Sequence, residues 1–145
     1  MWHNSVYSHE KVIRSTIYSS VSSDTLFSFD EVSGEDASQN GVGELFKQDE
    51  NFFLIGIETD ETIRSSPVIG TPIRVFGSLY VSFFTKETGS DLTNKSKLEQ
   101  FCKLFSNKVV AGVRFKPFTP TETVRISGFT QYSGFISFNF DYIEE

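Results

Sequence analysis

The sequence predicts an α+β domain with a mixed or antiparallel sheet of about four to five strands, flanked by two helices. Three observations support this fold class. The length of 145 residues is typical of one domain. Two stretches, Ile73–Thr85 and Tyr132–Ile143, alternate in the manner of strands. A third stretch repeats apolar residues at helical spacing between residues 98 and 105. We therefore expect a single domain spanning residues 1–145.

The composition supports a packed domain that needs no disulfide. The chain has 16 Phe, and each buried ring contributes roughly 1.5–3 kcal/mol. Its single cysteine, Cys102, cannot form an intrachain disulfide, which fits synthesis in a reducing cytoplasm. The formal net charge of −6 argues against a nucleic-acid binder. The N-terminus has no signal-peptide pattern and no apolar run is long enough to cross a membrane, so we expect a soluble protein.

The first third of the chain predicts one helix and one irregular segment. Ile13, Ile17 and Val21 are spaced four apart and share a helical face, so we expect a helix within Val6–Val21. Asp30–Glu50 contains three glycines and seven acidic residues without an apolar period, which indicates a mobile acidic loop or arm.

The middle of the chain predicts two strands. Asn51–Thr59 is apolar and β-branched, as in a buried strand. A turn or short edge segment should follow, because Pro67 and Pro72 are excluded from a central strand. Ile73–Thr85 carries apolar side chains on both faces, with Gly77 marking a bulge or bend. One face has Val75, Leu79, Val81 and Phe83, and the other has Phe76, Tyr80 and Phe84.

The last third predicts a helix and two strands. Asp91 or Thr93 is placed to cap a helix that buries Leu98, Phe101, Cys102 and Phe105. A strand follows at Val109–Phe115, and then Pro117 and Pro120 should break regular pairing. The final strand alternates, with Ile136, Phe138, Phe140 and Tyr142 on a core face and Ser137, Asn139 and Asp141 on a wet face.

No set of residues predicts catalysis, a cofactor or a metal site. His3 and His9 are six residues apart near the terminus, which favours surface positions over a shared metal. Glu58, Asp60 and Glu61 could hold a hard cation, but calcium loops need more ligands at stricter spacing. Cys102 lies on the apolar helical stripe and is interpreted as a core residue. We therefore expect a protein that is not an enzyme.

The order of these elements resembles the tail terminator proteins of long-tailed (siphovirus-type) bacteriophages. The similarity covers roughly Asn51 to Ile143 and is carried by an ordered set, because no single motif is specific. The matching residues are Arg74 and Gly77, the turn Thr88-Gly89, Leu104-Phe105, Gly112-Val113-Phe115 and the closing Phe138-Phe140-Tyr142.

The resemblance implies a structural protein of the virion tail, at the junction between tail and neck. It would form a homohexameric ring that caps the tail tube, ends its polymerisation and joins the head–tail connector. DNA would only pass through the lumen, and the acidic charge suits this. The implied contact residues toward another subunit or the tube are Glu58, Asp60, Arg64, Arg74, Phe76, Ser78, Tyr80, Ser82, Phe118 and Thr121.

Two other functions remain open at this point. Another neck or tail-completion protein would share the size, acidity and ring symmetry of a terminator. A small-molecule-binding α+β domain could instead line an apolar pocket with phenylalanines, although a packed core is their commoner use.

Overall fold

The computed structural model describes residues 3–29, 51–64, 66–86, 90–126 and 128–143. The predicted acidic loop Asp30–Glu50 and the turn Thr88-Gly89 lie outside these residues. In chain order the elements are α1 (Ser8–Ser20), β1 (Phe27–Phe29), β2 (Phe52–Arg64), β3 (Ile73–Thr85), α3 (Asp91–Cys102), β4 (Val109–Val110), β5 (Val113–Phe115), β6 (Thr119–Ile126) and β7 (Phe129–Tyr142). Both predicted helices are present.

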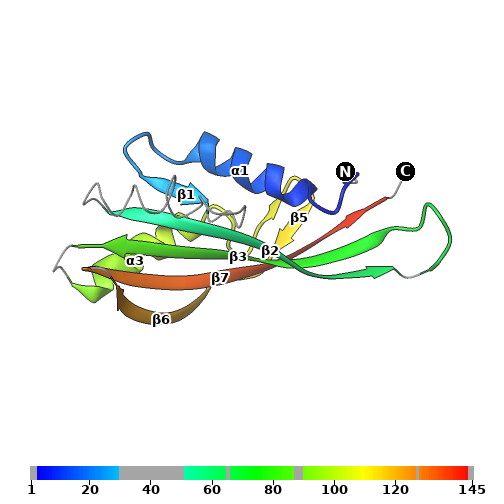
Figure 1. Ribbon diagram of the computed structural model, residues 1–145. Helices are drawn as coiled ribbons and strands as arrows, with labels where there is room; N and C mark the ends of the chain where they lie inside the picture. The colour runs from blue at the N-terminus through cyan, green and yellow to red at the C-terminus, as the bar shows by residue number, and fades with distance from the viewer. Residues whose placement is uncertain (1–2, 30–50, 65, 87–89, 127, 144–145) are drawn as a thin grey trace, which may run out of the picture.

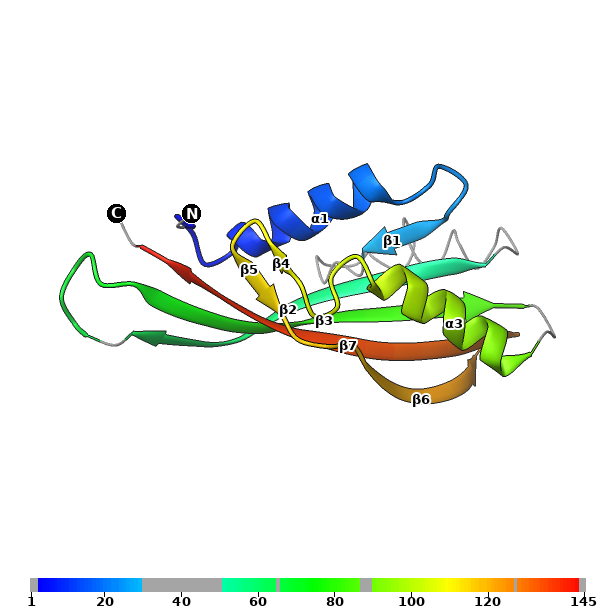
Figure 2. The ribbon, with the colours of Figure 1, turned by 180° about the vertical axis from the view of Figure 1, so that it is seen from behind.

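The strands form one mixed sheet, long and curled, with the two helices on one side (Figures 1 and 2). Its order is β1-β2-β3-β7-β5-β4, and β6 also pairs with β7. Among the described strands, β1 and β2 are the one parallel pair, and the long strands β2, β3 and β7 are antiparallel. The fold class α+β with a mixed sheet is thus confirmed.

In the described residues the sheet has seven strands, more than the four to five that the sequence predicts. The predicted strand Val109–Phe115 is a hairpin, because Ala111 (φ 47°) and Gly112 (φ 83°) take the left-handed conformation of a tight turn. The segment after Pro117 also pairs, as β6, although we expected its prolines to prevent this. Pro120 is tolerated there because β6 is an edge strand, where a missing N–H costs no ladder hydrogen bond.

The second strand also continues further than predicted. β2 extends through Asp60 to Arg64 and pairs with β3 along its whole length. The expected bulge lies in β2, not at Gly77: Asp60 is the extra residue between Thr59 and Glu61. Gly77 serves close packing, since a Cβ there would lie 2.5 Å from the Phe138 ring and 2.4 Å from the Glu58 carbonyl oxygen.

The main core lies between the helices and one face of the sheet, which we call the inner face. It is built from Ile13 and Ile17 of α1, Leu98, Phe101 and Cys102 of α3, and the inward residues of β2, β3 and β7. Phe53 stacks between Phe83 and Phe101, with ring centroids 4.6 and 4.3 Å apart. These aromatic contacts fix both the register of the sheet and the position of α3.

The two histidines contradict the prediction that they lie at the surface. His9 is fully buried and His3 is 8% exposed, and both rings pack on Phe140. His9 Nδ1 lies 3.0 Å from the Val6 carbonyl oxygen, to which it donates, so its Nε2 accepts from the Thr59 hydroxyl at 3.3 Å. Since each ring nitrogen has a partner, a buried neutral histidine is accommodated.

Two further details of α3 follow from its surroundings. Its N-cap is Ser90, whose hydroxyl accepts from the backbone N–H of Leu92, and not the predicted Asp91 or Thr93. Asp91 is the first helical residue, and it accepts instead from the Tyr132 hydroxyl at 2.6 Å. Cys102 is fully buried as predicted, and burial raises the pKa of its thiol to about 12.

Candidate functional site: the outer face of the sheet

The face of the sheet opposite the helices, the outer face, brings together most of the predicted contact residues. Pairing of β3 with β7 places five of them in a row: Arg74, Phe76, Ser78, Tyr80 and Ser82. Their partners on β7 share this face: Asp141, Asn139, Ser137, Phe135 and Ser133. The alternation of a strand dictates this sharing, because every second residue points to the same side.

Aromatic side chains occupy the centre of the outer face. Tyr80 is 42% exposed although it lies on the central strand β3. Its ring centroid is 6.2 Å from that of the half-buried Phe135, and Gly56 of β2 leaves the space beside it open. Phe76 is half-buried two positions further along the same face, beyond Ser78. An apolar group of this kind with a polar rim is typical of a protein contact surface.

One end of the aromatic centre is bounded by an ion-paired network. Arg74 donates to both carboxylate oxygens of Asp141, at 2.9 and 3.3 Å. Arg114 reaches the same carboxylate at 3.3 Å and donates to Asn139 at 2.6 Å. Hydrogen bonding to Arg74 is the main cause that lowers the pKa of Asp141. The arginines are substantially exposed, so the network orients side chains more than it stabilises the fold.

Hydroxyl groups join the three long strands on the outer face. Ser78 is buried and donates to the Asp60 carboxylate at 3.2 Å, which the bulge turns toward β3. Ser82 lies 2.9 Å from Ser133 and accepts from the Gln131 amide at 3.1 Å. These bonds hold the surface in one conformation, as a rigid docking face requires.

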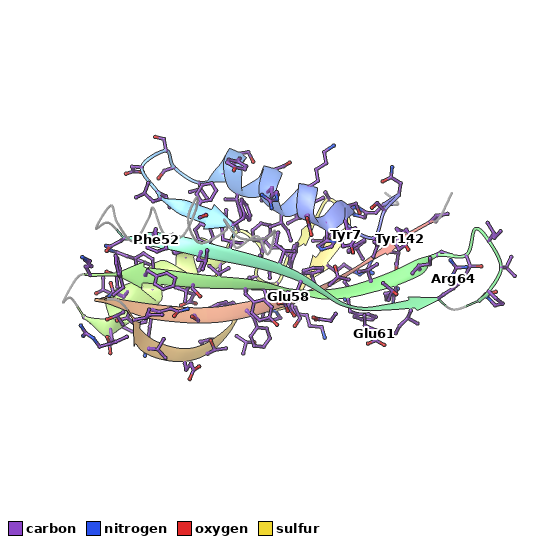
Figure 3. The ribbon with its side chains drawn as sticks, viewed as in Figure 1. Tyr7, Phe52, Glu58, Glu61, Arg64 and Tyr142 are labelled. Atoms are coloured by element: carbon purple, nitrogen blue, oxygen red, sulfur yellow. The ribbon has the colours of Figure 1, made fainter. Side chains whose placement is uncertain are left out.

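The acidic residues of β2 point away from α1. Glu58 pairs with Ser78 and Glu61 with Phe76, so both lie on the outer face, as Figure 3 shows for the labelled side chains. Arg64 lies further along, at the end of β2. Among the described residues no group of three or more His, Cys, Asp or Glu is arranged to hold a metal ion.

Two predicted contact residues lie elsewhere. Phe118 packs against the main core, where its ring covers Gly134 of β7 so closely that a Cβ there would be 2.2 Å away. Thr121 is exposed on the edge strand β6. Both line a hollow between α3 and β6, on the inner side of the sheet. Arg64 also differs, because it pairs with Ile73 of the inner face. The structure thus places Phe118, Thr121 and Arg64 apart from the other seven.

Sequence reasoning omitted two features of this surface. Phe135 belongs to the wet face of β7, and continuing the alternation of Ser137 and Asn139 by one step could have found it. The apolar pair Val68 and Ile69 in the β2–β3 turn is 64% and 83% exposed. A V-I pair between Pro67 and Gly70 was visible as an apolar interruption of a polar turn.

A groove on the helix side is the second concave feature. It lies between the C-terminal end of α1 and α3, above Phe53, Phe83 and Phe101, and its volume is about 530 Å³. Lys97 and Gln100 of α3 lie along its rim. The volume is in the range of ligand pockets, roughly 300–1,000 Å³, but the groove is open to solvent on one side.

Comparison with known proteins defines the fold only. No family model and no curated protein matches this sequence. Among solved structures, one whose name describes no function aligns with a TM-score of 0.59 at 9% sequence identity. The alignment covers 94% of this chain and 98% of that chain. At this identity the match shows that the same fold occurs elsewhere. In the part of the chain that the structure describes, no helix combines the length and apolarity needed to cross a membrane.

Proposed function

We propose that this protein is a structural subunit of a bacteriophage tail: six copies form a ring that caps the tail tube and ends its polymerisation. The same ring would present a face to the head–tail connector. The observation that carries the proposal is the outer face, a central aromatic surface on a sheet whose two described helices, α1 and α3, pack on the opposite side.

The chemistry of the described residues supports a contact role over a catalytic one. His9 and Cys102 are enclosed by the core and line neither groove. The buried Tyr132 does line the hollow between α3 and β6, but its hydroxyl already donates to Asp91 and accepts from Asn94. The outer face instead offers rings, hydroxyls and an arginine–carboxylate network already bonded among themselves. Such a surface recognises another protein by shape and by its aromatic centre.

A ring also suits the charge of the chain. A net charge of −6 on each copy would multiply around a closed lumen and repel DNA that passes through it. Ring contacts are heterologous, so each subunit needs two different surfaces, and closure limits the number of copies. The same properties suit another neck protein, which would bind the connector but would not end tube growth.

Native mass spectrometry with electron microscopy of the same sample tests the ring, and addition of tail tubes tests the cap. We expect a hexamer with a central hole and density on one end of the tubes. Tyr80→Asp should abolish ring or cap formation while the circular dichroism spectrum of the subunit is kept. Tyr7→Asp is the matched control, since Tyr7 is 64% exposed at the start of α1, away from the outer face (Figure 3).

The results separate the candidates. Normal ring assembly together with normal tube capping by the Tyr80→Asp variant would remove the outer face from the proposal. Rings that bind connector but leave tube length uncontrolled would indicate a different neck protein. A small molecule retained in native mass spectra would favour the ligand-binding alternative, for which the groove beside Phe101 provides the space.

A further inference from the structure

The turn between β2 and β3, together with the end of β2, forms a projecting arm, defined here as residues 60–64 and 66–72. It extends past the N-terminal end of α1 at one end of the subunit (Figures 1 and 2). From Asp60 to Arg64 every residue is exposed. At the tip Val68 and Ile69 are 64% and 83% exposed, and Gly70 turns the chain with φ 92°.

An exposed valine–isoleucine pair at a projecting tip is costly for a protein that stays alone. Burying each of these side chains contributes roughly 1.5–3 kcal/mol. Their own subunit leaves them 64% and 83% exposed, so this contribution is available to a partner. Projecting apolar tips therefore act as anchors in protein interfaces.

The groove between α1 and α3 has the properties of the complementary surface. Its floor is the stack of Phe53, Phe83 and Phe101, and Val21 and Leu104 form half-buried apolar walls. The groove above this aromatic floor has a volume of about 530 Å³. A hairpin tip that carries two aliphatic side chains is the shape that such an open apolar groove accepts.

The arm and the groove lie in opposite halves of the elongated subunit. Figure 2 shows α3 and the C-terminal end of α1 over one half of the sheet and the arm beyond the other half. An arm cannot reach the groove of its own chain in this geometry. Two complementary surfaces at opposite ends of one molecule generate a head-to-tail contact, the kind that closes into a ring.

Charges favour the same pairing. The β2 part of the arm, residues 60–64, carries two carboxylates and one arginine. The segment 91–103, which contains α3, carries three lysines and two carboxylates, and Lys97 is on the groove rim. An acidic arm approaching a helix with excess lysine gains attraction and a preferred orientation.

From these observations we infer that the tip of the arm, Val68 and Ile69, packs into the α1–α3 groove of the next copy. This contact joins successive subunits and leaves the outer face free for the tube or connector. The inference rests on the proposed ring, because it names the contact that builds it.

Disulfide trapping between two single variants tests the contact directly. Ile69→Cys chains are mixed with Gln100→Cys chains, oxidised, and separated without reductant. We expect a heterodimer of the two variants in the assembled protein, and closed multimers when both changes are in one chain. The control is a mixture of Ile69→Cys chains with Tyr7→Cys chains, which should give no disulfide-linked heterodimer. The native Cys102 is buried, and the unmodified protein measures its background.

Assembly energetics provide a second, independent measurement. Ile69→Asp should raise the concentration at which half of the protein is assembled by at least tenfold, with an unchanged circular dichroism spectrum. The control is Val109→Asp on β4, another exposed apolar residue at 69% exposure and outside the groove lining. Both changes add one charge. A difference between the two variants in the concentration at half assembly therefore reports the contact itself.

The possible failures of the two proposals are distinct. Rings that assemble normally with Ile69→Asp and give no trapped product overturn the arm–groove contact, even if they cap tubes. A protein that is monomeric at all concentrations also overturns it, as does a small molecule that fills the groove. Trapped, closed rings that fail to cap tubes support the contact and refute the proposed cap.

Discussion

Acid should destabilise this protein through His9, a buried residue of α1 that packs on the inner face of the sheet. Its imidazole is fully buried between Phe138 and Phe140, with ring centroids 5.0 and 5.2 Å away. Burial, together with the nearby His3, lowers the pKa of His9 from 6.5 to about 4, and the hydrogen bond to the Val6 carbonyl opposes this only in part.

The sign of the effect follows from proton binding. The unfolded chain binds a proton at His9 near pH 6.5, whereas the folded chain does so only near pH 4. Stability from the neutral imidazole is therefore fully present above pH 6.5 and is lost as the pH falls toward 4. Between pH 7 and pH 5 we expect a loss of about 2 kcal/mol in the free energy of unfolding.

Urea unfolding of the subunit at half-unit pH steps measures this loss. The carboxylate of Asp141 does not interfere, because its pKa is lowered below 3.8 and its contribution is lost only at more acidic pH. His9→Gln should be less stable at pH 7 but nearly independent of pH between 7 and 5. An equal pH slope in the wild type and His9→Gln would refute the assignment of this effect to His9.

Three further predictions concern the fold. Gly77→Ala should lower the free energy of unfolding in urea by about 1–3 kcal/mol, because the added Cβ would overlap the Phe138 ring. Gly56→Ala, whose added Cβ would have its nearest contact at 3.7 Å, should leave the free energy of unfolding nearly unchanged. Ser90→Ala should cost about 1 kcal/mol by removing the helix cap, and a similar loss in Thr93→Ala would contradict that assignment. The Cys102 thiol, whose pKa is raised to about 12, should resist a thiol reagent at pH 8 until the protein unfolds.

Periodicity located the elements that pack against the core. The apolar spacing of Leu98, Phe101 and Cys102 predicted α3, and the alternation in Ile73–Thr85 gave β3 with the bounds that the structure shows. These patterns are local, because one face of each element must be apolar to be buried. The same alternation located the row Arg74 to Ser82 that forms much of the outer face.

Long-range pairing decided what local patterns could not. The extension of β2 beyond Thr59 depends on β3 lying beside it. The mostly polar residues from Asp60 to Arg64 predicted only a turn or short edge segment. β6 pairs with β7 in spite of Pro120, because only the sheet order makes it an edge strand. Propensity is a weak guide where a neighbouring strand supplies the hydrogen bonds.

Local periodicity was enough to predict the fold class, the helices α1 and α3, the long central strands and the burial of Cys102, since each depends on the spacing of nearby residues. Only the tertiary structure decided that His9 is buried and that Phe118 belongs to the core. It also decided that the arm and the α1–α3 groove lie in opposite halves. These depend on which distant segments meet, as Phe140 meets His9, and no local pattern encodes such contacts.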